Sequence, residues 1–336
     1  MAPNKNTMKQ VVIDFPKQFT ESLEIAKNWS IPALSSEIKN VLVCGLGGSG
    51  IGGTILAELV ASECKVPVLV SKTYTLPAYG DKNTLLIACS YSGNTEESLD
   101  AFDEAHKRGM QIIAITSGGQ LEAKCKEAGV PAILIPGGMP PRGAFAYPIV
   151  QLLNVMNRLG LIGSALVNQL DNLPSFLANG QEETAKLAAE FTEKLYDKIP
   201  VLYADSKIEG VLVRFRQQIN ENSKMLCWHH VYPEMNHNEL VGWTKKDDQL
   251  AVVTFHTSID HPRVTKRMEV SNEVYRKYTP NVFDVTAEGS NLLEEVVHLI
   301  HLGDWISVLL AEKKGIDPVE VNIITHLKGE LAKFHG

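Results

Sequence analysis

Short apolar runs alternate with amphipathic stretches from about residue 40 to residue 136. The runs are four to six residues long and rich in β-branched side chains, which is typical of buried strands. They cover residues 41–44, 66–70, 85–90, 111–116 and 132–136. The residues between them show helical spacing at 51–62, 95–108 and 120–128, and Gly109 and Gly129 follow two of these helices as expected C-caps. This alternation predicts a parallel sheet with helices on both faces.

A second alternating series follows the polar segment 171–185. Its expected strands cover residues 200–204, 250–256 and 282–287, and its expected helices cover 207–226, 262–278, 291–311 and 318–333. An apolar helix at about 144–160 precedes it, and Asp317-Pro318 is expected to open the last helix as N-cap and first helical residue. We therefore predict an α/β protein of two doubly wound, flavodoxin-like domains.

The boundary between these domains is expected near residues 165–185. Residues 1–165 then hold an N-terminal segment and the first domain, and residues 175–336 hold the second domain. The first 35 residues show no clear role of their own and are candidates for packing across both domains.

Charge and cysteine content narrow the class of protein. The 336 residues include 32 Lys and Arg against 39 Asp and Glu, so the net charge of −7 disfavours a nucleic-acid partner. The five cysteines are scattered and never spaced C-x-x-C, which favours buried free thiols in a reducing compartment over a redox or metal role. No run approaches the length of a membrane span, and the first ten residues contain no apolar signal core. We expect a soluble, cytoplasmic protein without a membrane partner.

A glycine-rich loop follows the first predicted strand. It reads Gly45-Leu46-Gly47-Gly48-Ser49-Gly50 and leads into a helix, so backbone N–H groups and the positive end of the helix dipole can face an anion. The same G-x-G-x-x-G pattern occurs in dinucleotide-binding proteins, which also need an acid about 20 residues further on. Here that position reads Val70-Ser71-Lys72, which leaves only a 2′-phosphate at Lys72 as a cofactor alternative. A turn without any ligand is the other alternative.

A second loop, Ser90-Tyr91-Ser92-Gly93-Asn94-Thr95-Glu96, follows the run LLIACS. Ser90, Ser92 and Thr95 surround a glycine between a strand and a helix, and each hydroxyl can donate to a phosphate oxygen. A simple helix cap would need only one of them. This loop therefore favours a small phosphorylated metabolite over a nucleotide.

The sequences GLGGSG and SYSGNTEE together resemble the sugar isomerase (SIS) domain, which binds phosphosugars. Combined with PPRG at 140–143 and NENSK at 220–224, they resemble the bifunctional phosphoglucose/phosphomannose isomerases. The resemblance extends from about residue 35 to the end, and the two SIS domains of that family match the two predicted domains. It implies a homodimer, hexose 6-phosphate substrates, and neither a metal nor another cofactor.

The resemblance also implies roles for four residues. Glu221 matches the catalytic base, and it shares one helix face with Arg214 and Gln217 at the spacing i, i+3, i+7. His237 matches the histidine that assists ring opening across the dimer interface, and its ordinary pKa near neutrality suits proton transfer. Arg142 matches the arginine that stabilises the enediolate, because a guanidinium keeps its charge. Lys328 matches a C-terminal lysine that acts with the histidine, with Lys333 as the alternative.

We therefore predict an aldose–ketose isomerase for glucose, mannose and fructose 6-phosphates. Gly47, Gly48, Ser49, Ser90, Ser92, Thr95 and Arg142 are its expected substrate-binding residues, and Glu221, His237, Lys328 and Arg142 its catalytic residues. The alternatives are a non-catalytic phosphosugar sensor, an NADP-dependent dehydrogenase, and a metal cluster at His229-His230 with His237-x-Glu239. The sequence does not decide whether mannose 6-phosphate is a substrate.

Overall fold

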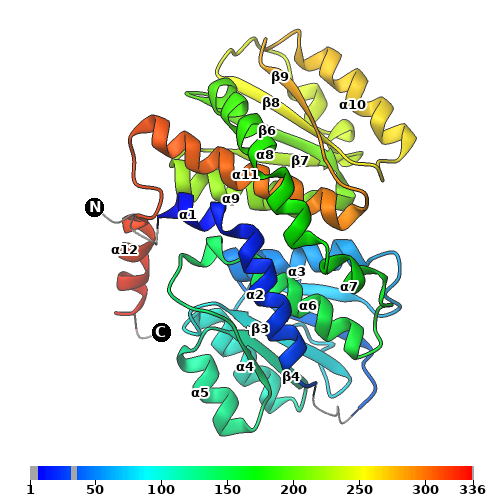
Figure 1. Ribbon diagram of the computed structural model, residues 1–336, viewed down its shortest axis with the longest axis vertical. Coiled ribbons are helices and arrows are strands. Elements are labelled where there is room, and N and C mark those ends of the chain that lie inside the picture. Colours follow the sequence, from blue (N-terminus) through cyan, green and yellow to red (C-terminus); the bar gives the residue numbers. More distant parts are fainter. Residues whose placement is uncertain (1–6, 32–35, 335–336) are drawn as a thin grey trace.

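Two parallel β-sheets covered by helices form the framework of the chain (Figure 1), seen in a computed structural model that describes residues 7–31 and 36–334. The strands of the first sheet are β1 (Asn40–Cys44), β2 (Val68–Ser71), β3 (Thr84–Ser90), β4 (Gln111–Thr116) and β5 (Ala132–Leu134). Those of the second sheet are β6 (Ile199–Asp205), β7 (Trp228–Tyr232), β8 (Leu250–His256) and β9 (Val282–Thr286). The strand orders are β2-β1-β3-β4-β5 and β7-β6-β8-β9, with every neighbouring pair parallel. The predicted doubly wound, flavodoxin-like fold class is confirmed.

Helices cover the two faces of the first sheet because alternate strand residues point to opposite sides. In β1, Val41 and Val43 join the core formed with α3 (Gly47–Val60) and α6 (Ala146–Arg158). Leu42 and Cys44 instead join the core formed with α4 (Glu96–Lys107) and α5 (Gly119–Ala128). Cysteines 44, 89, 125 and 227 are buried free thiols, as predicted, and Cys64 is half-buried.

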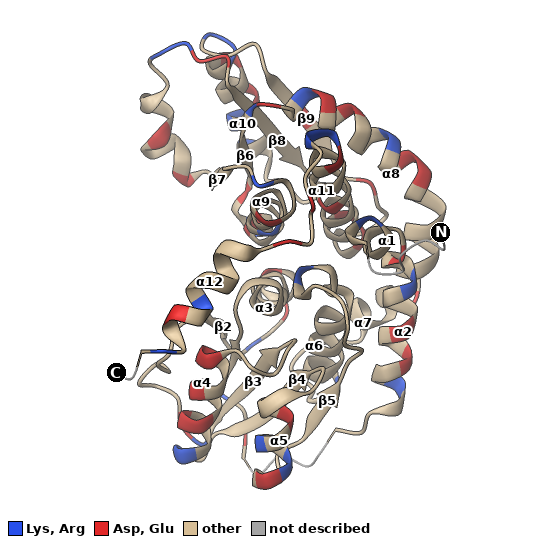
Figure 2. Cartoon of the chain, turned by 90° about the vertical axis from the view of Figure 1, so that its left-hand side faces the viewer, with Lys and Arg blue, Asp and Glu red and all other residues tan. Residues whose placement is uncertain are grey.

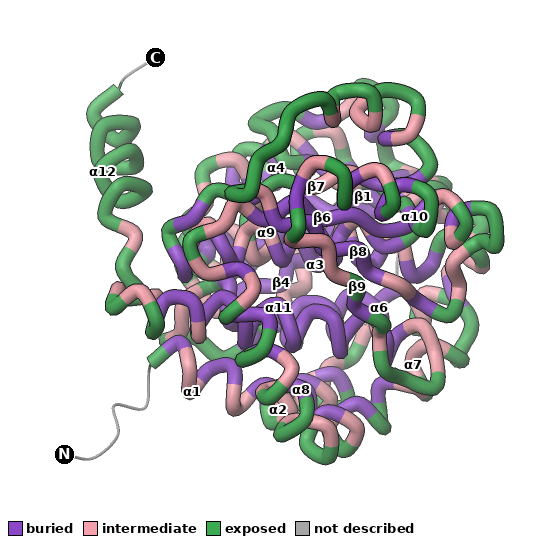
Figure 3. The backbone as a smooth tube through the Cα atoms, turned by 90° about the horizontal axis from the view of Figure 1, so that it is seen from above, coloured by how far each residue is buried: buried purple, intermediate pink, exposed green. Residues whose placement is uncertain are grey.

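One hydrophobic core continues from the first sheet into the second. Its helices include α8 (Leu173–Leu195), α9 (Glu209–Ser223) and α11 (Leu292–Lys314), of which α11 is buried along most of its length (Figure 3). The other face of the second sheet packs against α10 (Pro262–Tyr275). The short helix α7 (Ala165–Leu170) leads into α8.

The N-terminal segment packs across both halves of the chain. Helix α1 (Met8–Ile13) contacts α11, and α2 (Phe15–Asn28) lies along α6 and α8. The aromatic rings of Phe15 and His301 lie 5.1 Å apart, which joins α2 to α11. Residues 1–6 and 32–35 of this segment lie outside the described residues.

Three details differ from the predicted elements. Strand β7 was not predicted, because two histidines interrupt its apolar run. The polar segment 171–185 is largely helical, since α8 places Leu173, Leu177 and Thr184 on its buried side. The last helix, α12, spans Asn322–Leu331 rather than 318–333.

Helix α12 does not begin at Pro318, although the Asp317 carboxylate accepts the N–H of Val319 at 2.8 Å, as an N-cap there would. The N–H of Asn322 donates to the Oε1 of Glu320 rather than to the carbonyl of Pro318. The carbonyl of Pro318, which a longer helix would pair with Asn322, instead accepts a hydrogen bond from the guanidinium of Arg142.

Candidate active site

The two predicted anion-binding loops lie at the carboxyl ends of β1 and β3, which are neighbours in the first sheet. Helix α3 follows β1 onto one face of the sheet, and α4 follows β3 onto the other face. The connections therefore diverge between these strands, which is where doubly wound sheets bind ligands.

One hydrogen bond connects the two loops to each other, and further bonds lie within the second loop. The N–H of Tyr91 donates to the Oγ of Ser49 at 3.0 Å, and the Oγ of Ser90 lies 2.9 Å from the Oγ1 of Thr95. The Oγ of Ser92 accepts the N–H of Asn94 at 3.2 Å and remains exposed. The four hydroxyls predicted to bind phosphate thus belong to one pair of adjoining loops, with Ser90 at its buried end.

Gly48 brings the first loop against the turn that carries Arg142. That turn is the 3-10 helix η1 (Pro141–Gly143). A Cβ atom at Gly48 would lie 2.7 Å from the carbonyl oxygen of Pro141 and 3.0 Å from the Cα of Arg142, so only glycine fits here. The neighbouring Gly47 has a φ of +51°, a conformation that glycine adopts at little cost.

Arg142 and Glu221 form an ion pair at the junction of the two halves of the chain. The Nη1 of Arg142 lies 3.1 Å from the Oε2 of Glu221, which is on the last turn of α9. The Arg142 side chain is only 6% exposed, whereas that of Glu221 is 26% exposed. The carboxylate is therefore fixed by a buried cation and still accessible to a ligand.

Further contacts fix the guanidinium of Arg142 in place. Its Nε donates to the Oδ1 of Asn222 at 2.6 Å, and its Nη2 donates to the carbonyls of Pro318 and Val319. Burial lowers the pKa of Arg142, while the charge of Glu221 opposes that shift. An arginine pKa begins so high that the group stays a cation, so the site holds a permanent positive charge.

His237 and Lys328 lie elsewhere on the chain surface. His237 is exposed at the end of the 3-10 helix η3 (Glu234–His237), and its side chain has no hydrogen bond with any described residue. Lys328 is on α12, which has no buried residue within its fully described span. Figures 1 and 3 show α12 standing apart from the rest of the chain, and Figure 2 shows it from the side, with basic and acidic positions toward its C-terminal end. The structure thus brings together the two predicted anion-binding loops, Arg142 and Glu221, and leaves His237 and Lys328 exposed.

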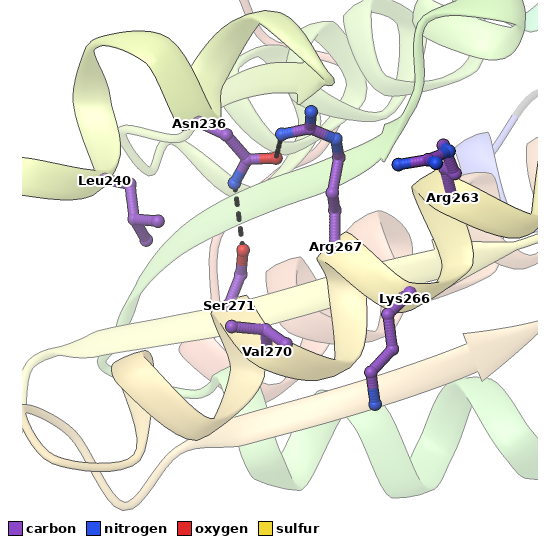
Figure 4. A pocket seen from close by; sticks show the side chains of 7 residues that line it. All are labelled: Asn236, Leu240, Arg263, Lys266, Arg267, Val270 and Ser271. Atoms are coloured by element: carbon purple, nitrogen blue, oxygen red, sulfur yellow. Dashed lines mark hydrogen bonds between the residues drawn. The ribbon is translucent and has the colours of Figure 1, made fainter.

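A cavity of about 410 Å³ lies beside the helix that bears His237 (Figure 4). Its lining residues are Asn236, Leu240, Arg263, Lys266, Arg267, Val270 and Ser271, so Arg142 and Glu221 are not part of it. Asn236 is held between the Nη1 of Arg267 at 3.3 Å and the Oγ of Ser271 at 3.0 Å. These two bonds anchor η3 on α10 and thereby fix the backbone next to His237.

Sequence reasoning missed several residues around Arg142. Gln218, not the predicted Gln217, joins Arg214 in a buried network with Asp304 of α11. Lys224, the left-handed C-cap of α9, donates to the carbonyl of Glu221 at 2.6 Å. The only available signal for Asp304 was an acid inside a long apolar helix, which is rare unless it is paired.

Among residues 7–31 and 36–334, no three His, Cys, Asp or Glu side chains are grouped as metal ligands. No helix of the described chain is long and apolar enough to span a bilayer.

Comparison with known proteins agrees with this architecture. Residues 35–135 match the family model of the SIS domain, and residues 184–331 match that of the bacterial phospho-glucose isomerase C-terminal SIS domain. Among solved structures, the chain is similar to tagatose-6-phosphate ketose/aldose isomerase from Escherichia coli, with a TM-score of 0.71, 17% identity, and coverage of 93% of this chain and 94% of that one. The fold and the two loops define a protein of two SIS domains.

The sequence relatives are more specific. The chain is 38% identical to a bifunctional phosphoglucose/phosphomannose isomerase from Caldicellulosiruptor bescii, over 97% of this chain and 99% of the relative. It is 35% identical to the enzyme of the same name from Aquifex aeolicus, over 96% and 98% of the two chains. The chain belongs to the family of bifunctional phosphoglucose/phosphomannose isomerases.

Proposed function

We propose that this enzyme interconverts glucose 6-phosphate and mannose 6-phosphate with fructose 6-phosphate. Family membership supports an isomerase over a non-catalytic phosphosugar sensor. The single observation that carries the proposed mechanism is the pair formed by Arg142 and Glu221 at 3.1 Å, beside the loop of Gly48. A base, a fixed cation and two anion-binding loops meet there.

In the proposed reaction, the hydroxyls of Ser49, Ser90, Ser92 and Thr95, with nearby backbone N–H groups, bind the phosphate. The carboxylate of Glu221 removes the proton from C2 of the open-chain aldose and returns it to C1, while a second proton moves from the C2 hydroxyl to the oxygen on C1. The intermediate is a cis-enediolate, whose negative oxygen is stabilised by Arg142. Rotation about the C2–C3 bond before reprotonation accommodates both C2 epimers.

Ring opening is assigned to His237 of the partner subunit, assisted by Lys328. His237 is exposed on a helix that is anchored to α10, so it is available to a neighbouring molecule. Lys328 has no side-chain partner among the described residues, whereas the alternative Lys333 pairs with Glu330 at 2.7 Å. The active enzyme is then a homodimer with sites shared between its subunits, and it requires neither metal nor nucleotide.

Glu221→Gln tests the assignment of the base. The amide keeps the shape of the side chain but cannot accept the proton, so we expect kcat to fall by about 10³-fold, within the range of general base catalysis. Activity from fructose 6-phosphate is measured by coupling to glucose-6-phosphate dehydrogenase, and sugar phosphate binding is measured by calorimetry. Glu190→Gln, on the exposed side of α8, is the matched control. Near-normal turnover by Glu221→Gln would overturn the assignment.

A further inference from the structure

A buried acid on α11 lies behind the ion pair of Arg142 and Glu221. The two carboxylate oxygens of Asp304 accept the Nη2 of Arg214 and the Nε2 of Gln218, each at 2.6 Å. All three residues are less than 5% exposed. Burying a charge in this way is costly unless it is paired and hydrogen-bonded, and here each oxygen has a donor.

The same two donors also hold the main chain of Arg142. The Nη2 of Arg214 donates to the Arg142 carbonyl at 3.0 Å, and the Nε2 of Gln218 approaches the same oxygen at 3.4 Å. The guanidinium of Arg214 lies 4.8 Å from the centre of the Phe145 ring. Asp304 thus orients the side chains of Arg214 and Gln218, and each of these donates a hydrogen bond to the main-chain carbonyl of Arg142.

A second chain of hydrogen bonds runs from Asp304 to the guanidinium of Arg142. The Oγ of Ser307 donates its hydrogen to the main-chain carbonyl of Asp304 at 2.7 Å. Because a hydroxyl has only one hydrogen to donate, this Oγ acts as the acceptor for the Nδ2 of Asn222, at 2.9 Å. That bond turns the amide oxygen of Asn222 toward the Nε of Arg142, at 2.6 Å. Both ends of Arg142, its carbonyl and its guanidinium, therefore depend on one turn of α11.

We propose that Asp304 is a positioning residue, which aims the guanidinium of Arg142 at the reacting oxygens. Its carboxylate holds the main chain of that arginine through Arg214 and Gln218. Its main-chain carbonyl supports the side chain of the same arginine through Ser307 and Asn222. This inference rests on the proposed function. Asp304 touches neither Glu221 nor the phosphate loops, so it acts only through Arg142. Its removal leaves substrate binding at the loops intact and misplaces the charge that stabilises the transition state.

Asp304→Asn is the first test. The amide fills the same space but offers one oxygen to two donors and leaves the charge of Arg214 unpaired. We expect kcat to fall about 10- to 100-fold, because small misplacements of a catalytic group have effects of this size, while KM changes less than about twofold. A change in KM with unchanged kcat would overturn the proposal.

The decisive measurement repeats the substitution in an Arg142→Met background. If Asp304 acts through Arg142, Asp304→Asn lowers the residual kcat by less than about twofold there, because the group that it positions is absent. An equal loss in both backgrounds would reveal a general structural role and overturn the proposal. This comparison tests only whether Asp304 acts through Arg142, whereas Glu221→Gln tests the catalytic base, so either proposal can fail without the other.

Two further variants keep the test valid if Asp304→Asn fails to fold. The pair Arg214→Met with Asp304→Leu replaces the buried ion pair by apolar groups, which is often neutral for stability. Ser307→Ala removes only the partner of Asn222, and Ser22→Ala, another fully buried serine, is its control. We expect the double variant and Ser307→Ala to lower kcat in folded protein, and the control to leave it unchanged. Folded variants with full kcat would overturn the proposal.

Discussion

At the scale of single residues, the candidate site depends on backbone contacts so close that no larger side chain fits between them. Gly48 is the clearest case, because its Cα faces the backbone of Pro141 and Arg142. A methyl group at this position must push the η1 turn away, and the neighbouring atoms belong to the main chain and cannot rotate aside. The glycine thus permits the close approach of the η1 turn, which places Arg142.

We therefore predict that Gly48→Ala lowers kcat by at least about tenfold, since displacement of a catalytic group by a fraction of an ångström is enough for such a loss. Gly52→Ala in the same helix is the control, because its Cβ would meet only the side chains of Leu152 and Pro148, at ordinary distances of 3.5 Å and 3.7 Å. That variant should keep full activity and gain stability through its better helix propensity. Steady-state kinetics of both variants check the prediction, and a fully active Gly48→Ala would contradict it.

At the scale of secondary-structure elements, α3 of the first half meets the start of α9 in the second half. Gly210, near the N-terminus of α9, donates its N–H to the Oε1 of Glu58 at 2.7 Å. Its lack of a side chain permits this contact, because a Cβ there would lie 2.8 Å from Glu58. Burial raises the pKa of Glu58 from 4.5 to about 8, and the hydrogen bond from Gly210 opposes that shift.

This contact should make stability depend on pH. Between pH 4.5 and about 8 the folded chain retains a proton on Glu58 that the unfolded chain releases, so Glu58 destabilises the fold progressively as the pH rises through this window. Glu58→Gln removes the titration and keeps an acceptor for Gly210. We expect its free energy of unfolding, measured by urea denaturation, to rise relative to that of the native chain between pH 5 and pH 8, by on the order of 3 kcal/mol, because each unit of pKa shift corresponds to about 1.4 kcal/mol. The exposed control Glu190→Gln should differ from the native chain in free energy of unfolding by the same amount at every pH. The same pH-independent difference for Glu58→Gln would contradict this prediction.

At the scale of the whole molecule, the single chain holds only part of the proposed machinery in one place. Arg142, Glu221 and the two predicted anion-binding loops adjoin, whereas His237 lies exposed near the end of η3. Helix α12 also exposes the apolar side chains of Ile323 and Leu327, and Phe334, which follows the helix, is exposed as well. Both features support the proposal that the working unit is a dimer.

Hybrid dimers test the shared site directly. Glu221→Gln and His237→Ala subunits are each expected to be inactive as homodimers. When they are co-expressed, about half of the dimers are mixed, and one of the two sites in each mixed dimer has both native residues, so about a quarter of native activity should return. The double variant Glu221→Gln/His237→Ala, mixed with Glu221→Gln, is the control and should restore none. No recovery in the first mixture would place both residues in the same subunit's site.

The sequence by itself determined the strands of the first sheet, most helices, and the two loops at strand ends. These features depend on local periodicity and on glycine and hydroxyl residues that are adjacent along the chain. It did not reveal β7, because two histidines interrupt the apolar run and only the pairing with β6 identifies the strand. It also did not reveal the start of α12, where the Pro318 carbonyl accepts a hydrogen bond from the distant Arg142.

Only the tertiary structure decided what holds the candidate site together. Arg142 is 79 residues from Glu221 and more than 160 residues from Asp304 along the chain, yet the packing of α9 and α11 against η1 connects all three. No local pattern marks Gln218 rather than Gln217, because one position along a helix rotates a side chain by about 100° and the neighbouring helix alone selects the inward face. The side chains of the candidate site are held in position by contacts between segments that are distant along the chain, and only the fold determines which segments meet.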